Sequence, residues 1–291
     1  MISIIITAYK ESKTIGKCVN SIISQDIKEE YELFVIAPDK ETLDAARKIS
    51  KKVLILKDDA SGKWNALNLG FKTAKGRLVI LCDGDTYLGG NSINALIEAF
   101  DDKTIGIVSG KVLSLNQRNN LMGYWSQLLT SVAHRERLAR RKKKDYIDCS
   151  GYLIGLRTGI IDKLPPNLLS EDAYMSHYVW NKGYHTGYVP LAKVYVKYPT
   201  NLKDWIKQKR RSTGGYPQLK KYFKFKNKMR SFSTEAFKGP LYALSYANNF
   251  KEFIWSSFLF PVRLYLWFLV FYDKTSNKKF KQIWQRVDST K

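Results

Sequence analysis

The chain has 291 residues, of which 44% are hydrophobic, so it can bury a large core as one domain or as one domain with an appendage. Its three cysteines are odd in number, widely spaced and lack a C-x-x-C pattern, which excludes a disulfide framework and indicates reduced thiols in a cytosolic compartment. The net charge of +23 comes mostly from three stretches rich in Lys and Arg, which are 135–144, 201–230 and 273–291. Basic patches on a near-neutral body indicate contact with phosphates, either of nucleic acid or of a membrane surface.

Apolar runs and helical spacings alternate along the first 200 residues. The expected strands are residues 2–9, 31–37, 52–57, 77–85, 105–115, 146–157 and 193–199. The expected helices are residues 10–25, 42–50, 61–76, 170–183 and 200–215, the last ended by a Gly-Gly pair. Strands that alternate with helices predict an α/β fold with a mostly parallel sheet and flanking helices. Beyond residue 215 the sequence is basic, aromatic and helical in tendency.

Two aspartates separated by one glycine end the predicted strand 77–85, at Asp83 and Asp85. In an extended chain, residues i and i+2 face the same side, so both carboxylates could approach one cation. Mg²⁺ or Mn²⁺ prefers oxygen ligands and bridges phosphates, so it would neutralise a diphosphate leaving group. Ligands of parallel sheets bind at the carboxyl ends of strands, where this pair is expected. The alternative for so short a motif is a solvated acidic turn.

The predicted helix 170–183 begins with the sequence Ser-Glu-Asp, and Ser170 is at its N-cap position. Acids in a first helical turn favour the helix dipole without any catalytic role. The functional alternative is that Asp172 acts as a general base and takes the proton of an acceptor hydroxyl.

Gln208 and Arg211 share one face of the predicted helix 200–215, with Asp204 one turn earlier. A solvated charged face would explain this pattern. The functional alternative is that Arg211 binds a phosphate and Gln208 orients a sugar or the base aspartate.

Several common catalytic motifs are missing from the sequence. It contains no GxSxG, GxxxxGK[ST] or GxGxxG pattern, and its three histidines do not have HExxH spacing. Serine hydrolysis, phosphate-loop chemistry and dinucleotide binding therefore have no positive support.

Six short stretches, taken in order, resemble a known family. They are "ISIIITAYKES", "GKWNALNLGFKTAKG", "LCDGD", "SGYLIGLR", "LSEDAYMSHYVWNKGY" and "QKRRS". Together they are similar to the family 2 inverting glycosyltransferases with a GT-A fold. The match is closest to the membrane-associated branch around cellulose and hyaluronan synthases, and to shorter archaeal-type enzymes that act on lipid-linked glycans. The resemblance covers roughly residues 1–215.

The resemblance implies roles for residues that match the family's motifs. The metal-binding acidic pair falls on Asp83 and Asp85, with Mg or Mn as the expected cation. The catalytic base, the last acid of a Thr/Ser-Glu-Asp motif, falls on Asp172. The lysine that touches the donor diphosphate falls on Lys63.

The remaining donor-binding positions also follow from the resemblance. The first-strand loop that holds the nucleotide falls on Thr7, Tyr9 and Glu11. The Gln-x-x-Arg-Trp motif falls on Gln208 and Arg211, with Ser212 in place of the tryptophan. The family often has two aspartates after the second strand for the nucleotide base, but here "IAPDKE" leaves only Asp39. The missing tryptophan removes an aromatic platform for a growing polymer, which favours addition of one or a few sugars.

The segment 253–272, "FIWSSFLFPVRLYLWFLVFY", is long enough to span a bilayer. Against a simple span stand Pro261, Arg263 and basic flanks on both sides, because a crossing would place a basic tail outside. A segment lying in the membrane interface, a real span and a buried core helix are three alternatives.

These observations predict three regions: a GT-A catalytic domain at 1–200, basic interfacial helices at 201–250, and a membrane-associated segment with a basic tail at 251–291. The expected activity is metal-dependent, inverting transfer of a hexose to a polyprenyl-phosphate type of lipid-linked acceptor, in cell-surface glycan or N-glycan biosynthesis. The donor would be GDP-mannose or a UDP-linked glucose or GlcNAc. The catalytic domain would face the cytoplasm, at the membrane surface. A processive polysaccharide synthase and a basic nucleic-acid-binding protein are the alternatives, although no nucleic-acid partner is expected.

Overall fold

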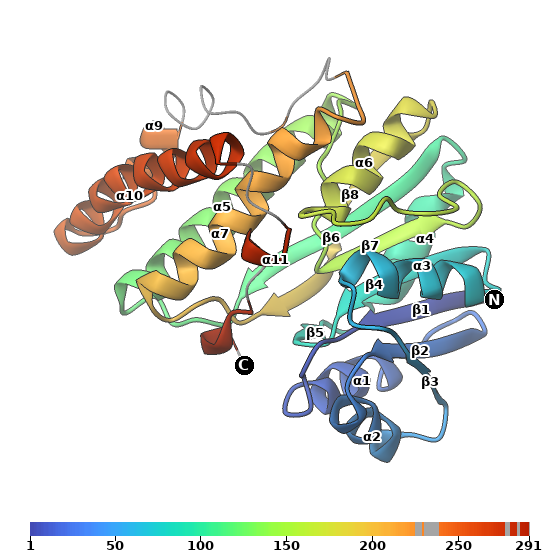
Figure 1. The fold of residues 1–291 in the computed structure, drawn as a ribbon. Coiled ribbons are helices and arrows are strands. Elements are labelled where there is room, and N and C mark those ends of the chain that lie inside the picture. Colours follow the sequence, from blue (N-terminus) through green and yellow to red (C-terminus); the bar gives the residue numbers. More distant parts are fainter. Residues whose placement is uncertain (225–228, 230–238, 277–279, 284–285, 291) are drawn as a thin grey trace. The chain divides into compact units, whose positions relative to one another are not determined.

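The chain divides into two compact units (Figure 1). The first comprises residues 1–113 and 137–196, and the second comprises residues 114–136 and 197–290. The computed structural model describes residues 1–224, 229, 239–276, 280–283 and 286–290. Parts of the predicted regions 201–250 and 251–291 lie outside these described residues.

One mixed sheet forms the centre of the first unit. In the described part of the chain its eight strands follow the order β3-β2-β1-β4-β7-β6-β8-β5. Their bounds are β1 (Ile2–Thr7), β2 (Tyr31–Ala37), β3 (Val53–Lys57), β4 (Leu78–Asp83), β5 (Thr86–Leu88), β6 (Ile105–Ser114), β7 (Leu153–Arg157) and β8 (His185–Val196). The strands β1 to β4 pair in parallel. Antiparallel pairs join β7 to β4 and β6, and β5 to β8, so the parallel part is the amino-terminal half.

The strand β1 has a parallel neighbour on each side and is buried at all its positions. Its sequence, ISIIIT, is a near-continuous β-branched run, as expected for a strand covered on both faces. Thr7 at its end is paired in register with Ile36 of β2 and Asp83 of β4. The carboxyl ends of these strands therefore meet at one edge of the sheet, where ligands of parallel sheets bind.

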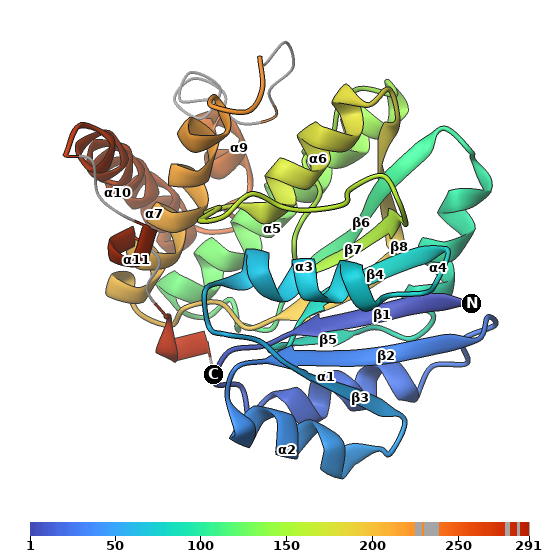
Figure 2. The same cartoon turned by 45° about the vertical axis from the view of Figure 1, so that its right-hand side comes forward.

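Helices cover both faces of the parallel half. In the first unit they are α1 (Ile15–Ile23), α2 (Lys40–Ile49), α3 (Lys63–Thr73), α4 (Ser92–Glu98) and α6 (Glu171–Asn181), with a short 3-10 helix at Ala99–Asp101. The helices α1 and α2 lie on one face and α3 lies on the other (Figures 1 and 2). The buried face of α1 consists of Ile15, Cys18, Val19 and Ile22, which have helical spacing. This agrees with the α/β fold that the alternation predicts.

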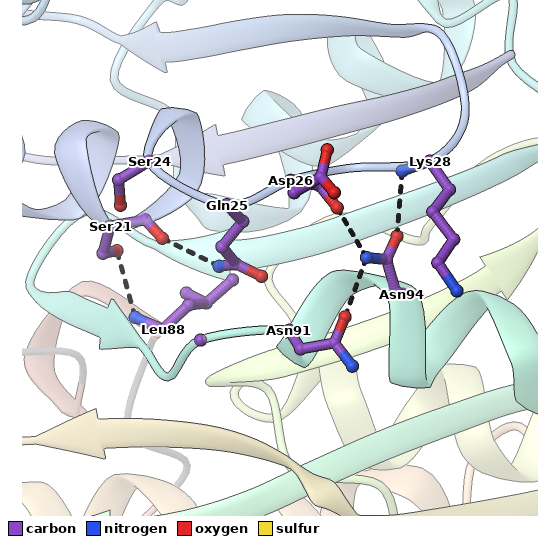
Figure 3. A pocket seen from close by; sticks show the side chains of 9 residues that line it. Ser21, Ser24, Gln25, Asp26, Lys28, Leu88, Asn91 and Asn94 are labelled. Carbon is purple, nitrogen blue, oxygen red and sulfur yellow. Dashed lines mark hydrogen bonds between the residues drawn. The ribbon is translucent and has the colours of Figure 1, made fainter.

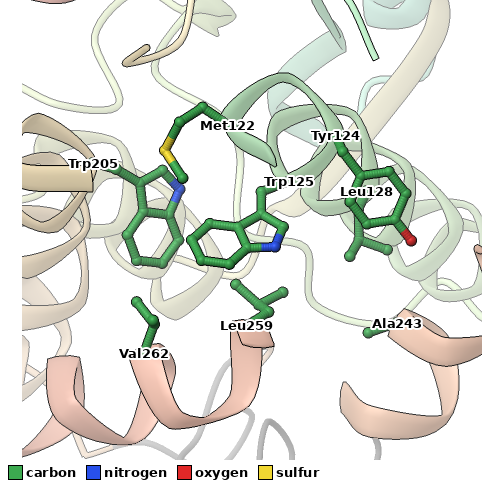
Figure 4. Packing of buried hydrophobic residues seen from close by; sticks show 8 residues of the cluster. All are labelled: Met122, Tyr124, Trp125, Leu128, Trp205, Ala243, Leu259 and Val262. Atoms are coloured by element: carbon green, nitrogen blue, oxygen red, sulfur yellow. The ribbon is translucent and has the colours of Figure 1, made fainter. Parts of the chain in front are cut away.

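Helices form the described part of the second unit. They are α7 (Leu202–Leu219), α9 (Gly239–Ser245), α10 (Phe250–Thr275), α11 (Phe280–Ile283), a 3-10 helix at Asp288–Thr290 and the first part of α5 (Leu121–Lys142), which continues into the first unit. Their core includes Trp125 of α5 and Trp205 of α7, with ring centroids 5.4 Å apart. Figure 4 shows Leu259 and Val262 of α10 pointing toward these two rings. The predicted membrane segment thus supplies part of this core.

Most predicted elements have different bounds in the structure; β8 begins at His185 rather than at residue 193, and α4, α5 and β5 were not predicted. The expected strand 146–157 is a strand only from Leu153, and β4 ends at Asp83 rather than at residue 85. The helix α7 begins after its predicted cap, Asn201, whose side chain accepts from the Asp204 N–H. It does not end at the Gly-Gly pair but continues to Leu219, through Pro217. Packing of α7 against α10 offsets the roughly 1 kcal/mol that each interior glycine costs.

Candidate active site

A tight turn places the two predicted metal-binding aspartates at the sheet edge. Asp83 is the last residue of β4, and Asp85 follows in the turn before β5. The Gly84 N–H donates to the Thr7 carbonyl oxygen at 3.0 Å. A Cβ at Gly84 would lie 2.8 Å from the Ala8 Cβ, closer than side chains approach, so this position requires glycine. The prediction that both acids continue one extended strand is therefore wrong, because the chain turns after Asp83 to stay against β1.

Lys63 forms an ion pair with Asp83. It is the first residue of α3, and its ammonium Nζ contacts the Asp83 Oδ1. Burial opposes the lysine charge, but the nearby Asp83, Glu171 and Asp172 carboxylates raise the pKa of Lys63 above its usual value. The fold therefore brings together three predicted site residues from α3, β4 and α6. The sequence predicted no role for Glu171, whose negative charge also raises the pKa of Lys63.

Three hydrogen bonds orient the predicted base, Asp172, one of them from the Ala173 N–H to its Oδ1 at 2.9 Å. Its Oδ2 accepts from the Gly151 N–H at 3.1 Å, and its Oδ1 accepts from the Ser170 hydroxyl at 3.0 Å. Ser170 is at the N-cap position of α6, as predicted, but its hydroxyl bonds Asp172 rather than a backbone N–H. Neither orienting role was predicted. The sequence signal for the Gly151 role was the first glycine of "SGYLIGLR", one of the six family-like stretches.

A buried polar cluster holds the Gly151 segment against α6. The Ser176 hydroxyl donates to the Asp172 carbonyl oxygen at 2.7 Å and accepts from the Cys149 N–H at 3.0 Å. Behind it, the His177 ring stacks on Tyr146 with centroids 4.4 Å apart. Burial lowers the pKa of His177, and the nearby Asp148 opposes this effect. These contacts fix the position of the Gly151 N–H before any substrate is present.

The loop after β1 is tied to the start of α2. Asp39 caps α2 by accepting from the Thr42 N–H at 3.0 Å, and its other oxygen accepts from the Lys10 N–H at 2.8 Å. Partial burial opposes ionisation, but these bonds hold the pKa of the Asp39 carboxyl below its usual value. The Glu11 N–H donates to the Thr42 hydroxyl at 2.8 Å, and Tyr9 lies in the same loop. Asp39 thus shapes the loop, and its contact with a donor stays a prediction.

Gln208 and Arg211 lie on α7, in the second unit. The Gln208 Oε1 is buried and has no hydrogen-bond partner among the described residues. A buried acceptor of this kind requires a partner, such as an ordered water, an ion or a ligand. Ser212, which replaces the family's tryptophan, bonds back to the Lys209 carbonyl oxygen at 3.2 Å.

The acidic pair is the only predicted metal site. Within the described residues no group of three or more His, Cys, Asp or Glu side chains converges on one point. Two carboxylates nevertheless suit Mg²⁺ or Mn²⁺, because such ions commonly bind one or two carboxylates and complete their shell with substrate phosphates and water. Asp83 and Asp85 therefore fit a cation that arrives with a diphosphate.

A separate pocket of about 280 Å³ lies between the end of α1 and the start of α4 (Figure 3). It contains none of the predicted site residues. The Ser21 hydroxyl accepts from the Leu88 N–H, and the Asn94 amide bonds Asp26, Lys28 and Asn91 across it. These bonds join two turns of the fold, which accounts for the polar lining.

We expect Gly151→Ala to lower turnover about 10-fold while leaving donor affinity unchanged. A Cβ at this position would lie 3.3 Å from the Asp172 Cβ and Oδ2, so the carboxylate must shift by a few tenths of an ångström. Small misplacements of a reacting group are costly, up to roughly 100-fold for 1 Å. Steady-state kinetics and donor titration would measure this. Gly90→Ala is the matched control, because an added Cβ there meets no atom within 4 Å. Equal loss in both variants, or a lower donor affinity with unchanged turnover, would contradict the orienting role.

A family model for glycosyltransferase-like family 2 matches residues 1–215 of this chain. Among curated proteins, the chain is 26% identical over 284 residues to a probable glycosyltransferase, YdaM, of Bacillus subtilis (strain 168), covering 91% of this chain and 66% of that protein. It is 25% identical over 281 residues to the poly-beta-1,6-N-acetyl-D-glucosamine synthase of Staphylococcus aureus (strain COL), and this match covers 91% of this chain and 64% of that protein. The chain thus spans just under two thirds of the length of these relatives.

Two solved structures share the fold. The mannosyltransferase PcManGT from Pyrobaculum calidifontis, in complex with GDP-Man and Mn2+, is 15% identical, with a TM-score of 0.69 over 96% of this chain and 88% of that one. S. aureus TarS 1-349, in complex with UDP-GlcNAc, is 17% identical, with a TM-score of 0.52. The match covers 88% of this chain and 79% of TarS 1-349. The mixed sheet with flanking helices matches these GT-A neighbours, which confirms the predicted α/β, GT-A class. The prediction of a mostly parallel sheet is wrong, because β5 and β7 pair in antiparallel fashion with their neighbours.

Proposed function

Because this chain belongs to glycosyltransferase-like family 2, we propose that it is an inverting glycosyltransferase that moves a hexose from a nucleotide sugar to a lipid-linked acceptor. The observation that carries the proposal is the convergence of Lys63, Asp83 and Asp172 beside the carboxyl ends of β1 and β4. The lysine and the aspartates suit a diphosphate with its cation, and Asp172 is oriented as a base.

The transfer follows from these roles. Asp172 takes the proton of the acceptor hydroxyl, and the oxygen attacks the anomeric carbon of the donor sugar from the side opposite the diphosphate. The bond between that carbon and the diphosphate oxygen breaks, so the configuration inverts and a nucleoside diphosphate leaves. The Lys63 ammonium stabilises the negative charge that develops on the leaving diphosphate. Asp83 and Asp85 would hold Mg or Mn, which would supply further charge neutralisation there.

The remaining donor contacts are assigned by the family motifs. Thr7, Tyr9 and Glu11 would hold the nucleotide, with Asp39 near its base. The unpartnered Oε1 of Gln208 supports a ligand contact on α7, together with Arg211 as a phosphate-binding residue. The donor class is GDP-mannose or a UDP-linked glucose or GlcNAc. Two structural neighbours, in complex with GDP-Man and with UDP-GlcNAc, support the first and the last of these.

We assign residues 1–200 to catalysis, 201–250 to basic interfacial helices and 251–291 to membrane association. Among the described residues one helix, Phe250–Thr275, is long and apolar enough to cross a bilayer, a test that core helices of soluble proteins also pass. Only 28% of its most apolar window is buried, which favours a membrane role over a core helix. The catalytic region would face the cytoplasm, where nucleotide sugars and reduced thiols occur together.

A donor screen tests the proposal. Purified protein is incubated with radiolabelled GDP-mannose, UDP-glucose or UDP-GlcNAc, a membrane lipid extract and Mn²⁺. We expect release of a nucleoside diphosphate together with label in the lipid fraction for one donor. Salt-sensitive RNA binding with no nucleotide-sugar binding would overturn the proposal in favour of a nucleic-acid-binding protein.

We expect a product with one added sugar or very few. The family resemblance implies that processive synthases hold the growing chain on a tryptophan, and the ring stacking that Ser212 cannot provide is typically worth about 1 kcal/mol. Mass analysis of the lipid fraction after incubation with excess donor would measure product length. A ladder of long, evenly spaced products would instead identify a processive synthase.

A further inference from the structure

The structure describes all residues of the helix α10. This helix exposes large apolar side chains on one face and buries both polar and apolar residues on the other. Nine of its large apolar side chains are at least 47% exposed, among them Phe250 at 78% and Phe268 at 62%. They recur at helical spacing along one side. The residues buried on the other side include three polar ones, Glu252, Ser256 and Asp273. The other four buried residues are apolar. The unusual feature is the outer face, because a helix of a soluble protein normally keeps its exposed face polar.

Polar residues of the inner face bond α10 to the rest of the second unit at both ends. Glu252 accepts two hydrogen bonds at 2.7 Å from the guanidinium of Arg118, which precedes α5. Asp273 forms a bidentate ion pair with Arg210 of α7. The two acids are 21 residues apart, which is about 32 Å along a helix. Between them, Ser256 bonds Tyr124 at 2.6 Å.

After α10 the chain returns to the start of α7. The Ser289 N–H donates to the Asp204 Oδ2 at 3.1 Å, and its hydroxyl accepts from the Thr200 N–H. A bilayer-spanning α10 would place its two ends on opposite sides of the membrane. It would also pull Arg210 and its basic neighbours on α7 into the hydrocarbon, which is costly for charged side chains. The return of Ser289 to Asp204 and the pairing of Arg210 with Asp273 therefore argue against a span.

Charge identifies what covers the outer face. From residue 239 to residue 276 the only acids are Glu252 and Asp273, and both are buried and paired. The exposed charges of this stretch are Lys251 and Lys274, one near each end of α10. An apolar stripe bordered by cations alone suits anionic headgroups above a lipid surface.

We propose that the outer face of α10, with Leu241 and Tyr242 of α9, docks on the surface of a bilayer that contains anionic lipid, with α10 lying in the membrane plane. Leu241 is 74% exposed and Tyr242 is 41% exposed, so they extend the apolar surface. This inference rests on the membrane association in the proposed function but not on its lipid-linked acceptor. A second copy of this chain is the competing occupant of the same face.

Vesicle flotation of the full-length chain tests the docking. We expect binding to phosphatidylcholine vesicles that contain phosphatidylglycerol, weakened by added salt and by omission of the anionic lipid. Phe250→Ser combined with Phe268→Ser should lower the partition coefficient by roughly 10-fold for each ring removed from the interface. The matched control is Leu191→Ser, on β8 of the first unit, because Leu191 is 74% exposed. These substitutions leave Leu259 and Val262 in the core, so the second unit stays intact.

Depth measurements distinguish an in-plane helix from a span. Ile254, Tyr265 and Tyr272 lie on one line along the outer face and are 50%, 51% and 52% exposed. Each is replaced by a spin-labelled cysteine; the native cysteines are buried and would stay unlabelled. Equal immersion of the three labels supports the proposal. A deep label at position 265 with shallow labels at both ends would overturn it in favour of a span.

The remaining outcomes also separate the hypotheses. In one of them, the chain fails to bind vesicles and forms dimers in solution that the double Ser variant dissociates. That result would overturn the proposal in favour of a second copy of the chain on this face. Donor titration on the same samples reports the proposed function separately, because nucleotide-sugar binding requires no vesicles. Retained donor binding without vesicle binding would therefore refute the docking alone.

Discussion

Asp172→Asn is expected to lower transfer about 10²–10⁴-fold, the usual contribution of a general base, while donor binding is retained. The amide cannot take the acceptor proton, yet it has the same shape and can still accept from the Gly151 N–H. The measurement is single-turnover transfer with saturating donor, together with a donor titration.

The control for this variant is Asp162→Asn, which removes an exposed carboxylate of the same unit. We expect it to transfer normally. Loss of donor affinity in Asp172→Asn, with the thermal unfolding transition unchanged, would mean that Asp172 belongs to the donor site rather than serving as the base.

Asp85→Asn should abolish measurable transfer and most metal-dependent donor binding. One neutral ligand weakens a site for a hard cation, and even loss of an outer partner of a metal ligand lowers affinity about 10–100-fold. Donor titration with Mn²⁺ and with a chelator, for the native chain and the variant, measures the effect. The chelator should weaken donor binding to the native chain and change little in the variant.

Asp44→Asn, an exposed position on α2, provides the matched control and should bind donor normally. If chelator and Asp85→Asn both left donor affinity unchanged, the metal role of the pair would be refuted. Lys63 and Arg211 would then be the remaining candidates to neutralise the diphosphate.

Local sequence patterns predicted the parts of the fold that local interactions determine. The apolar run of β1, the helical spacing on α1 and the Asn201 cap each depend on neighbouring residues, and each is found where expected. The α/β class follows from their alternation. The length of α7 does not, because Gly214 and Gly215 favour an end that packing against α10 overrides.

The candidate site was predicted by motif but not by geometry. Asp83 and Asp172 were identified because short motifs mark them, whereas the Gly151 bond to Asp172 joins residues 21 apart, which no local pattern shows. The Gly84 turn was missed because the side chain that requires glycine there, Ala8, lies in the loop after another strand, β1. The apolar run 253–272 indicated a membrane helix, but the ion pairs of the acids on either side of it are evident only once Arg118 and Arg210 are placed beside them.

The bonds at both ends of α10 bear on how the proposed attachment would work. With its acids already paired to Arg118 and Arg210, and Ser289 back beside Asp204, none of the residues described in this unit would have to cross the bilayer. Attachment by one helical face also remains reversible, unlike a span. The amount of enzyme at the membrane would therefore follow the lipid composition that the cell maintains there.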